Sequence, residues 1–445
     1  MFKFKIYTLG CKVNQYDSAT LRRKLKEAGG EYLKTVAPTP ADLVIVNTCT
    51  VTTTAHRKDR RMIKKAKQEN PGAKVVVMGC WLKVYPEVKK KIQADLYWPV
   101  GRLDALTTEI SKIFSKKRKN RQNGYSQDGT DKEEGENKPT LLPPRKGERA
   151  RYFMKVQEGC EQFCSYCVIP YSRGKLTSRS VREVIEEARV VEKVGYEELV
   201  LCGIHLGLYN QEINSESRVE DLTFLIKQII KNTKKLRIRL SSIEVNDIGK
   251  NLIDLMKKEE RFCNHLHIPL QGGDDEILRL MNRPYDREYF REKIRAIRRA
   301  VPAVAITSDV IVGFPGETEE QFQNTYDFIA KLQLSKLHIF PYSSHPRTAA
   351  AKMDGHLPNS VKKKRADKLR RLSEELWQKY QWTMKGRFDK FKVLVEAIQA
   401  GEAVGKTEYY FNLPITGIGL GRLEIGKIVE VEKVSDDTRD SWRVV

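Results

Sequence analysis

Short apolar runs alternate with amphipathic stretches along most of the chain, which is the pattern of strands that are each followed by a helix. Over the first part of the chain this alternation predicts a small α/β domain with a parallel sheet, spanning residues 1–115. The strands expected there are 4–9, 43–46 and 75–78, and the helices lie near 17–28 and 55–68.

Residues 116–149 break this pattern with a stretch rich in Lys, Asn, Gly, Glu and Pro, which is too polar to bury a core and is expected to be a flexible linker. After it, six apolar strands recur with amphipathic helices between them, and they predict an open (βα)6 barrel over residues 150–382. Ligands of such sheets collect at the carboxyl ends of the strands. The strands are expected at 152–156, 199–202, 236–240, 265–268, 305–311 and 337–340.

The last part of the chain changes character again. A strongly basic helix is predicted over residues 360–380, and residues 383–445 contain apolar runs at 391–396, 409–414 and 428–434 with Gly-rich turns between them. Short strands with such turns predict a small antiparallel β-barrel. The chain as a whole is therefore expected to be of the α/β class.

Composition adds two constraints. The 445 residues include 81 Lys and Arg against 58 Asp and Glu, a formal net charge of +23, which favours a nucleic acid partner, although a lysine-rich surface that only aids solubility would look the same. No apolar run approaches a membrane span and no signal peptide is recognisable, so we expect a cytoplasmic protein without a membrane segment. In that compartment eight cysteines suggest metal ligation more than disulfides.

Cys160, Cys164 and Cys167, here called the barrel cysteine set, follow the first predicted barrel strand in EGCEQFCSYC. Three thiolates on one tight loop suit three irons of a four-iron cluster and leave the fourth iron open to a small ligand. The alternative is a zinc loop that a distant His or Cys completes.

Cys11, Cys49 and Cys80, here called the N-terminal cysteine set, each stand at the carboxyl end of a predicted strand. Neighbouring parallel strands end along one edge of a sheet, so a second three-cysteine site is expected there, with buried structural cysteines as the alternative. Cys202 and Cys263 fall outside both sets and are interpreted as core residues.

The loop of the barrel cysteine set resembles the signature of radical S-adenosylmethionine (SAM) enzymes, and TLGCKVN and NTCTVT resemble motifs of the methylthiotransferase family. The segments LVLCGIHLG, RLSSIEV, HIPLQGGDDEILRLMNRPY and SDVIVGFPGETEEQF are also similar to family segments and occur in the same order. The resemblance covers nearly the whole chain. It implies an N-terminal methylthiotransferase domain, a radical SAM barrel, a C-terminal TRAM domain, two [4Fe-4S] clusters and SAM, with no catalytic residue beyond the cluster ligands.

The resemblance also suggests where SAM binds. Tyr166, just before the last cysteine of the loop, matches the family position whose backbone approaches the adenine, and Ile311 resembles an apolar residue that packs on it. Ser242 and Glu244 stand where they could bond to the ribose or methionine end, or equally could cap a turn. The expected SAM-binding residues, which include two strand-end glycines, are Tyr166, Gly203, Ser242, Glu244, Ile311 and Gly313. Three histidines near strand ends are expected to be hydrogen-bonded rather than to ligate a metal: His205, His265 and His267.

A basic run, HRKDRRMIKKAK, follows Cys49 directly. A helix there would offer cationic side chains to the phosphates of a transfer RNA anticodon stem-loop, although a solvated charged helix is the alternative. The residues expected to contact RNA are Arg57, Arg60, Arg61 and Lys64. The other partner expected from the resemblance is a low-potential electron donor such as flavodoxin or ferredoxin, and the chain is expected to be a monomer.

Lys12 and Val13 follow the first cysteine, where the isopentenyladenosine branch of the family more often has Gln-Met. The motifs therefore resemble more closely the branch that acts on N6-threonylcarbamoyladenosine next to the anticodon. The expected activity is conversion of that base to its 2-methylthio derivative by radical SAM chemistry. The alternatives are methylthiolation of isopentenyladenosine or of a ribosomal protein, and a non-catalytic zinc protein that binds RNA.

Overall fold

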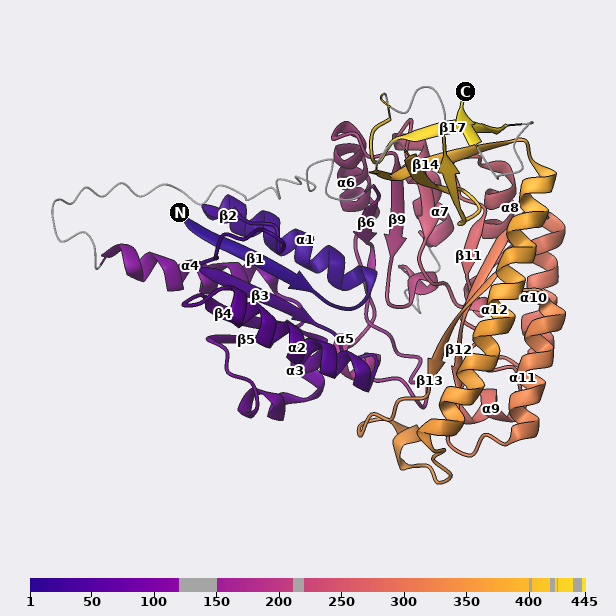
Figure 1. Cartoon of the computed structure of the whole chain (residues 1–445), viewed down its shortest axis with the longest axis horizontal. Coiled ribbons are helices and arrows are strands. Elements are labelled where there is room, and N and C mark those ends of the chain that lie inside the picture. Colours follow the sequence, from indigo (N-terminus) through magenta and orange to yellow (C-terminus); the bar gives the residue numbers. More distant parts are fainter. Residues whose placement is uncertain (120–149, 211–219, 400–401, 417–420, 422, 435–441) are drawn as a thin grey trace. The chain divides into compact units, whose positions relative to one another are not determined.

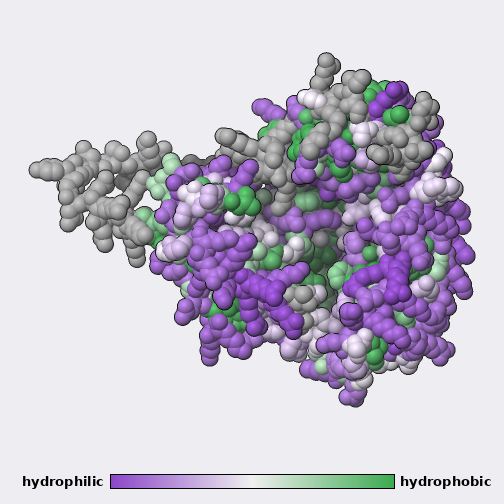
Figure 2. All heavy atoms as spheres, viewed as in Figure 1, coloured by the Kyte–Doolittle hydropathy of each residue, from purple (hydrophilic) through white to green (hydrophobic). Residues whose placement is uncertain are grey.

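The computed structural model describes residues 1–119, 150–210, 220–399, 402–416, 421, 423–434 and 442–445. It divides into two compact units, Met1–Pro144 and Arg145–Val445, which are described one at a time (Figure 1). Of the predicted linker, residues 116–119 continue a helix and the rest lies outside the described residues. The surface in view over the helices is mainly hydrophilic (Figure 2). No described helix combines the length and the apolar composition that a membrane crossing requires.

The first unit is a parallel sheet with helices on both faces. Its strands are β1 (Phe2–Thr8), β2 (Gly30–Tyr32), β3 (Leu43–Thr48), β4 (Lys74–Gly79) and β5 (Leu96–Pro99), and its helices are α1 (Lys12–Glu27), α2 (Thr53–Glu69), α3 (Cys80–Val84) and α4 (Leu103–Lys119). The strand order is β2-β1-β3-β4-β5, and every described pairing is parallel. The α/β domain expected from the sequence is therefore confirmed as a fold, with β2 and β5 as additional edge strands.

The central strand β3 is buried at every position because helices cover both faces of the sheet. Ile45 faces an apolar cluster that includes Leu21 of α1 and Leu106 of α4. Its neighbour Val46 faces the other cluster, which includes Ile63 of α2. The strand therefore reads as a continuous apolar run rather than as an alternating one.

The second unit contains the barrel. Its strands are β6 (Tyr152–Lys155), β9 (Glu198–Cys202), β10 (Arg237–Leu240), β11 (His265–His267), β12 (Ala305–Val312) and β13 (Lys336–Pro341), and its main helices are α6 (Val181–Lys193), α7 (Leu222–Asn232), α8 (Lys250–Lys258), α10 (Arg287–Ala300), α11 (Glu319–Leu332) and α12 (Asn359–Arg387). The shorter elements are β7 (Gln157–Glu158), β8 (Thr177–Ser178), α5 (Ile169–Arg173) and α9 (Asp275–Leu280).

Two parallel three-stranded sheets, β10-β9-β6 and β11-β12-β13, make up this barrel. Parallel bridges from Ile238 to Phe262 and from Ser242 to His267 join the two sheets, so the strands follow one another in chain order. Each of the six strands begins and ends within one residue of the range expected from the sequence. The partial (βα)6 barrel is therefore confirmed.

The C-terminal part forms an antiparallel sheet in the order β16-β15-β14-β17-β18, as expected for a small β-barrel. Its strands are β14 (Lys390–Gln399), β15 (Glu402–Thr407), β16 (Asn412–Ile415), β17 (Ile428–Lys433) and β18 (Trp442–Val444). Two barrel arginines hold this sheet: Arg237 Nη1 donates to the Lys392 carbonyl at 2.9 Å, and Arg239 Nη2 donates to that of Thr407 at 3.0 Å. The basic helix α12 continues to Arg387, seven residues beyond its expected end.

Candidate functional site

The barrel cysteine set lies on the tight loop between β7 and α5. Gly159 opens the loop with φ of +81°, and a Cβ there would fall 1.8 Å from the Lys175 carbonyl oxygen, so only glycine fits. The Cys160 N–H donates to the Gly174 carbonyl at 3.1 Å, and the Cys167 N–H donates to that of Cys164 at 2.9 Å. Backbone hydrogen bonds therefore hold the loop in shape, and it carries three thiols within eight residues.

These three thiols influence one another. Burial raises the pKa of Cys167 to about 12, and the neighbouring thiolates of Cys164 and Cys160 add to that effect. A thiol with a pKa this high is protonated at neutral pH in the metal-free chain.

The buried guanidinium of Arg283, whose side chain is only 2% exposed, anchors the middle of this loop. Nη1 donates to Cys164 Sγ at 3.2 Å and Nε donates to the Tyr285 hydroxyl at 3.1 Å. Nη2 pairs with the Glu244 carboxylate. Glu244, which the sequence places near SAM, thus orients the arginine that contacts a cysteine sulfur.

A second cation stands beside Cys160. His205 Nδ1 lies 3.6 Å from Cys160 Sγ, and Nε2 lies 2.9 Å from Oδ2 of Asp247. Burial acts to lower the pKa of His205, but its contacts with Asp247 and Cys160 outweigh burial and raise that pKa to about 10. A positive imidazolium therefore lies against the sulfur of Cys160.

Tyr166 and Ile311 come together although they lie far apart in the sequence. Both pack on the same apolar cluster, one from the cysteine loop and the other from β12. This wall beside the loop suits the flat, weakly polar face of an aromatic ring system. The buried members of the cluster are Ile277, Met281, Phe314, Tyr342 and Ala350.

The two glycines expected to approach SAM also lie close to other parts of the chain. A Cβ at Gly203 would lie 2.8 Å from Oε1 of Gln157, and one at Gly313, where φ is +71°, would lie 2.4 Å from Cγ of Lys362. Ser242 stays exposed at the end of β10 and bridges to His267. Ser242 is therefore the most exposed of the expected SAM residues, while the side chains of Tyr166, Glu244 and Ile311 are partly exposed.

In the first unit the N-terminal cysteine set gathers at the carboxyl edge of the sheet. Thr48 pairs with Gly79 in register, so Cys49 and Cys80 each follow directly after a paired position. A Cβ at Gly10, where φ is +96°, would lie 2.9 Å from Sγ of Cys49, so the backbone just before Cys11 rests against that side chain. The expected convergence of the three strand ends is present.

Two asparagines of the cysteine motifs fasten these strand ends. Asn14 Nδ2 donates to the carbonyls of Leu9 at 2.8 Å and Thr48 at 3.0 Å. Asn47 Nδ2 donates to the Asn14 carbonyl at 3.0 Å. The polar residues of TLGCKVN and NTCTVT therefore hold the ends of β1 and β3 at a fixed spacing, which positions Cys11 and Cys49.

The spacing of the sulfurs tests what kind of metal site fits. A single metal ion requires ligand atoms that lie close together. Among the described residues, one group of three or more His, Cys, Asp or Glu side chains has all its ligand atoms within 4.8 Å of one another, and that group contains no cysteine. Thiolates around one zinc ion sit about 2.3 Å from it and so about 3.8 Å apart. The sulfurs of each cysteine set are therefore not gathered at the spacing of a single-ion site.

The four basic residues expected to contact RNA form one exposed stripe on α2, here called the α2 basic stripe. Their spacing of three or four residues places them on one face of the helix. The opposite face buries Asp59, Ile63 and Ala66 against the sheet. The stripe consists of Arg57, Arg60, Arg61 and Lys64, all exposed, with the Arg60 guanidinium 5.8 Å from the ring centroid of Trp81.

Sequence reasoning missed Arg283, Asp247 and Asp59. Arg283 lies within HIPLQGGDDEILRLMNRPY and Asp59 within HRKDRRMIKKAK, but neither segment shows which residue its side chain contacts. Asp247 meets His205 across 42 residues. Cys202 and Cys263 are fully buried, which agrees with the core role expected for them.

Comparison with known proteins covers most of the chain. Residues 154–329 match the Radical SAM superfamily model, and residues 3–98 match the model of Uncharacterized protein family UPF0004. The chain is 36% identical to the threonylcarbamoyladenosine tRNA methylthiotransferase MtaB of Bacillus subtilis, over 96% of this chain and 92% of that protein. It is 32% identical to the tRNA-2-methylthio-N(6)-dimethylallyladenosine synthase of Thermodesulfovibrio yellowstonii, over 90% of each.

Among solved structures, the chain is similar to the radical S-adenosylmethionine methyltransferase TsrM from Kitasatospora setae, which was determined with cobalamin and a [4Fe-4S] cluster bound. The TM-score is 0.55 at 16% identity, over 79% of this chain and 77% of that one. At this identity the similarity shows a shared fold.

Proposed function

This chain belongs to the methylthiotransferase family of radical SAM enzymes, and from that premise we propose that it converts N6-threonylcarbamoyladenosine next to the anticodon of transfer RNA to the 2-methylthio derivative. One observation carries the proposal. Two separate sets of three cysteines lie in parallel-strand units, one on the loop after β7 and the other at the carboxyl ends of β1, β3 and β4. The chain is also 36% identical to a relative named for this base, against 32% for one named for the dimethylallyl base.

The barrel cysteine set holds one [4Fe-4S] cluster, and the N-terminal cysteine set holds the other. When bound, the first cluster and SAM supply a carbon radical, and the second cluster supplies sulfur. The protein contributes the thiolates and their surroundings: Arg283 and His205 place positive charge against Cys164 and Cys160. In the first unit, Gly10 and the two asparagines of the cysteine motifs keep the strand ends close enough for three thiolates to share one cluster.

The carboxyl edge of the barrel binds SAM. The apolar wall that Tyr166 and Ile311 share takes the adenine, and the exposed Ser242 hydroxyl meets the ribose or methionine end. Glu244 orients Arg283 through Oε2. Gly203 and Gly313 set the shape of the surrounding turns, because any side chain there would displace Gln157 or Lys362.

The anticodon stem-loop binds the α2 basic stripe through its phosphates. That stripe lies on the helix directly after Cys49, so phosphate contacts there bring RNA to the unit that carries the sulfur-donating cluster. The enzyme works in the cytoplasm as a monomer, and a small low-potential protein such as flavodoxin or ferredoxin delivers electrons to the barrel cluster. The domains are 1–115, 150–382 and 383–445, with 116–149 as the linker, and α4 and α12 extend past the first and second of these domain ends to Lys119 and Arg387.

The substrate is tested with the reconstituted enzyme and two transfer RNAs that differ only in the base next to the anticodon. Threonylcarbamoyladenosine carries a carboxylate that isopentenyladenosine lacks, and a pocket built for it must offer a cationic or donor group. We expect 2-methylthio product, measured by mass spectrometry, from the threonylcarbamoyl substrate and little from the other. Preferential turnover of the isopentenyl substrate would overturn the substrate assignment and leave the radical chemistry in place.

A further inference from the structure

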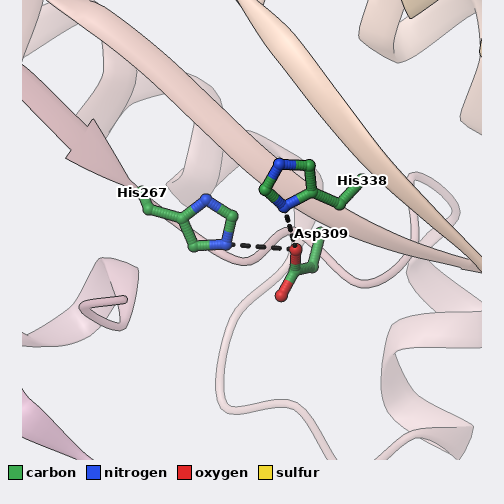
Figure 3. Close-up of side chains that lie close together, drawn as sticks. All are labelled: His267, Asp309 and His338. Atoms are coloured by element: carbon green, nitrogen blue, oxygen red, sulfur yellow. Dashed lines mark hydrogen bonds and ion pairs between the residues drawn. The ribbon is translucent and has the colours of Figure 1, made fainter. Parts of the chain in front are cut away.

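A group of polar side chains outside both cysteine sets converges on the wall of the barrel. His267 ends β11, Asp309 lies in the middle of β12, and His338 lies on β13. Asp309 and His338 are register partners, and His267 pairs with Thr307, one strand repeat before Asp309. Figure 3 shows both imidazole rings directed at one oxygen of the carboxylate, while the other oxygen points away from them. These three residues are here called the His-Asp-His triad.

The distances within the triad fit the first coordination shell of one ion. His267 Nε2 lies 3.1 Å and His338 Nδ1 lies 3.2 Å from Oδ1 of Asp309, and the three ligand atoms all lie within 4.8 Å of one another. Nitrogen and oxygen ligands bind zinc at about 2.0–2.2 Å, which separates them by about 3.3 Å in a tetrahedral shell and about 2.9 Å in an octahedral one. Both nitrogen–oxygen separations lie between these values, and the two ring nitrogens lie within 4.8 Å of each other.

Supporting contacts already orient one of the ligands. Thr307 Oγ1 lies 2.8 Å from His267 Nδ1 and 3.0 Å from His265 Nε2. His265 is itself held by ring stacking on Tyr410, with the centroids 3.9 Å apart. The hydroxyl contact at Nδ1 holds the ring in position and directs Nε2 toward Asp309. Metal-binding histidines in proteins have this kind of second partner.

The triad is accessible on one side. The side chains of His267, Asp309 and His338 are 9%, 26% and 41% exposed. An ion there would keep open coordination positions, as two-histidine, one-carboxylate sites do. Ile311 follows two residues after Asp309 on the same face of β12, so these positions face the side of the barrel to which SAM is assigned.

We propose that His267, Asp309 and His338 bind one divalent transition-metal ion, of the zinc or ferrous class, that is distinct from both iron-sulfur clusters. Hydrogen bonding alone places a proton between each ring and Asp309, whereas ligation replaces those protons with the ion. The donor set is two imidazoles and a carboxylate without sulfur, which suits a borderline divalent ion and not a soft one. The proposal rests on the positions of these side chains on the barrel strands. The methylthiolation reaction does not by itself call for such a metal site.

The test is a metal count on the cluster-containing full-length enzyme after equilibration with Zn²⁺ and removal of free ion. Zinc, iron and acid-labile sulfide are measured together, so that zinc in the triad is distinguished from zinc that has entered a cysteine site. We expect wild type to bind about one more zinc per chain than Asp309→Asn or His338→Ala, at equal iron and sulfide. Thr307→Val should weaken Zn²⁺ binding about 10- to 100-fold, because it removes only the orienting hydroxyl.

The matched control is His356→Ala, which removes an exposed histidine that is outside the triad. It should keep the wild-type zinc content. Equal zinc in wild type, Asp309→Asn and His338→Ala would overturn the proposal. Iron and sulfide counts report whether each variant has folded, and the result does not depend on which transfer RNA the enzyme modifies.

Discussion

Arg283 Nη1 lies 3.2 Å from Cys164 Sγ and donates to it, while Glu244 and Tyr285 hold the same guanidinium from its other nitrogens. Hydrogen bonds and positive charge at a cluster sulfur stabilise the more negative, reduced cluster and so raise its reduction potential. Arg283→Met is therefore expected to make the midpoint potential of the barrel cluster more negative, as measured by redox titration with EPR detection. Arg279→Met, which removes an exposed arginine, is the control. An unchanged potential in Arg283→Met would show that the contact does not act on the cluster.

The two cysteine sets should account for all cluster iron. Replacing the three residues of either set by alanine is expected to halve the iron and sulfide per chain, because each variant then lacks one of the two clusters. Loss of the barrel set should also abolish reductive cleavage of SAM. Cys202→Ala and Cys263→Ala, at fully buried positions outside the sets, should keep the full iron content. Reductive SAM cleavage by the variant without the barrel set would refute the assignment of the radical site.

The α2 basic stripe should control how strongly transfer RNA binding depends on salt. Neutralising its four residues to Gln removes up to four phosphate contacts, and the slope of log K against log salt should become shallower by about 3. Fluorescence titration at several salt concentrations measures this slope. A control variant removes four exposed cations elsewhere: Lys250, Lys257, Lys258 and Arg295. If both variants keep the wild-type slope, RNA binds another surface.

Glu198 should stabilise the junction between the barrel and the C-terminal sheet. It is fully buried and pairs with Arg237 at 2.6 Å and Arg239 at 2.9 Å. Burial alone would raise the pKa of Glu198, but the two arginines outweigh burial and lower that pKa, so the residue is ionised. Glu198→Gln leaves both buried guanidiniums without a counter-charge and is expected to lower the free energy of unfolding by about 3–5 kcal/mol. Glu186→Gln, at an exposed pair, should cost about 1 kcal/mol or less in the same denaturant titration.

Asp59 should give the first unit a stability that falls as pH rises. Its Oδ1 accepts from the Cys49 N–H at 3.3 Å, and burial raises the pKa of its carboxyl to about 8. The unfolded carboxyl ionises near pH 4, so between these values the folded chain binds the extra proton and loses stability as pH rises. Asp59→Asn stays neutral, and its stability relative to wild type should therefore grow from pH 5 to pH 8 by up to a few kcal/mol. Urea unfolding of the metal-free chain at both pH values measures this difference, with the exposed Glu31→Gln as the control.

The barrel strands could be located from sequence because their apolar runs are bounded by amphipathic helices. All six were found within one residue. The strands that were missed are β2, β5, β7, β8, β15 and β18. The edge strands β2 and β18 have only three residues each, and strands that short have no readable period. Helix α12 exceeds its expected end because packing of its last turn, through Met384, continues into the C-terminal apolar cluster.

The sequence by itself determined which residues carry chemistry, because cysteine spacing and the position of each cysteine after an apolar run are local properties of the chain. It also determined the α/β class, since hydrophobic periodicity sets the element type. Only the tertiary structure decided what surrounds those cysteines. Arg283 meets Cys164 across 119 residues, and Asp309 meets His267 from a different strand, because side-chain contacts depend on strand order and register. Neither the strand order nor the strand register can be predicted from a short stretch of sequence.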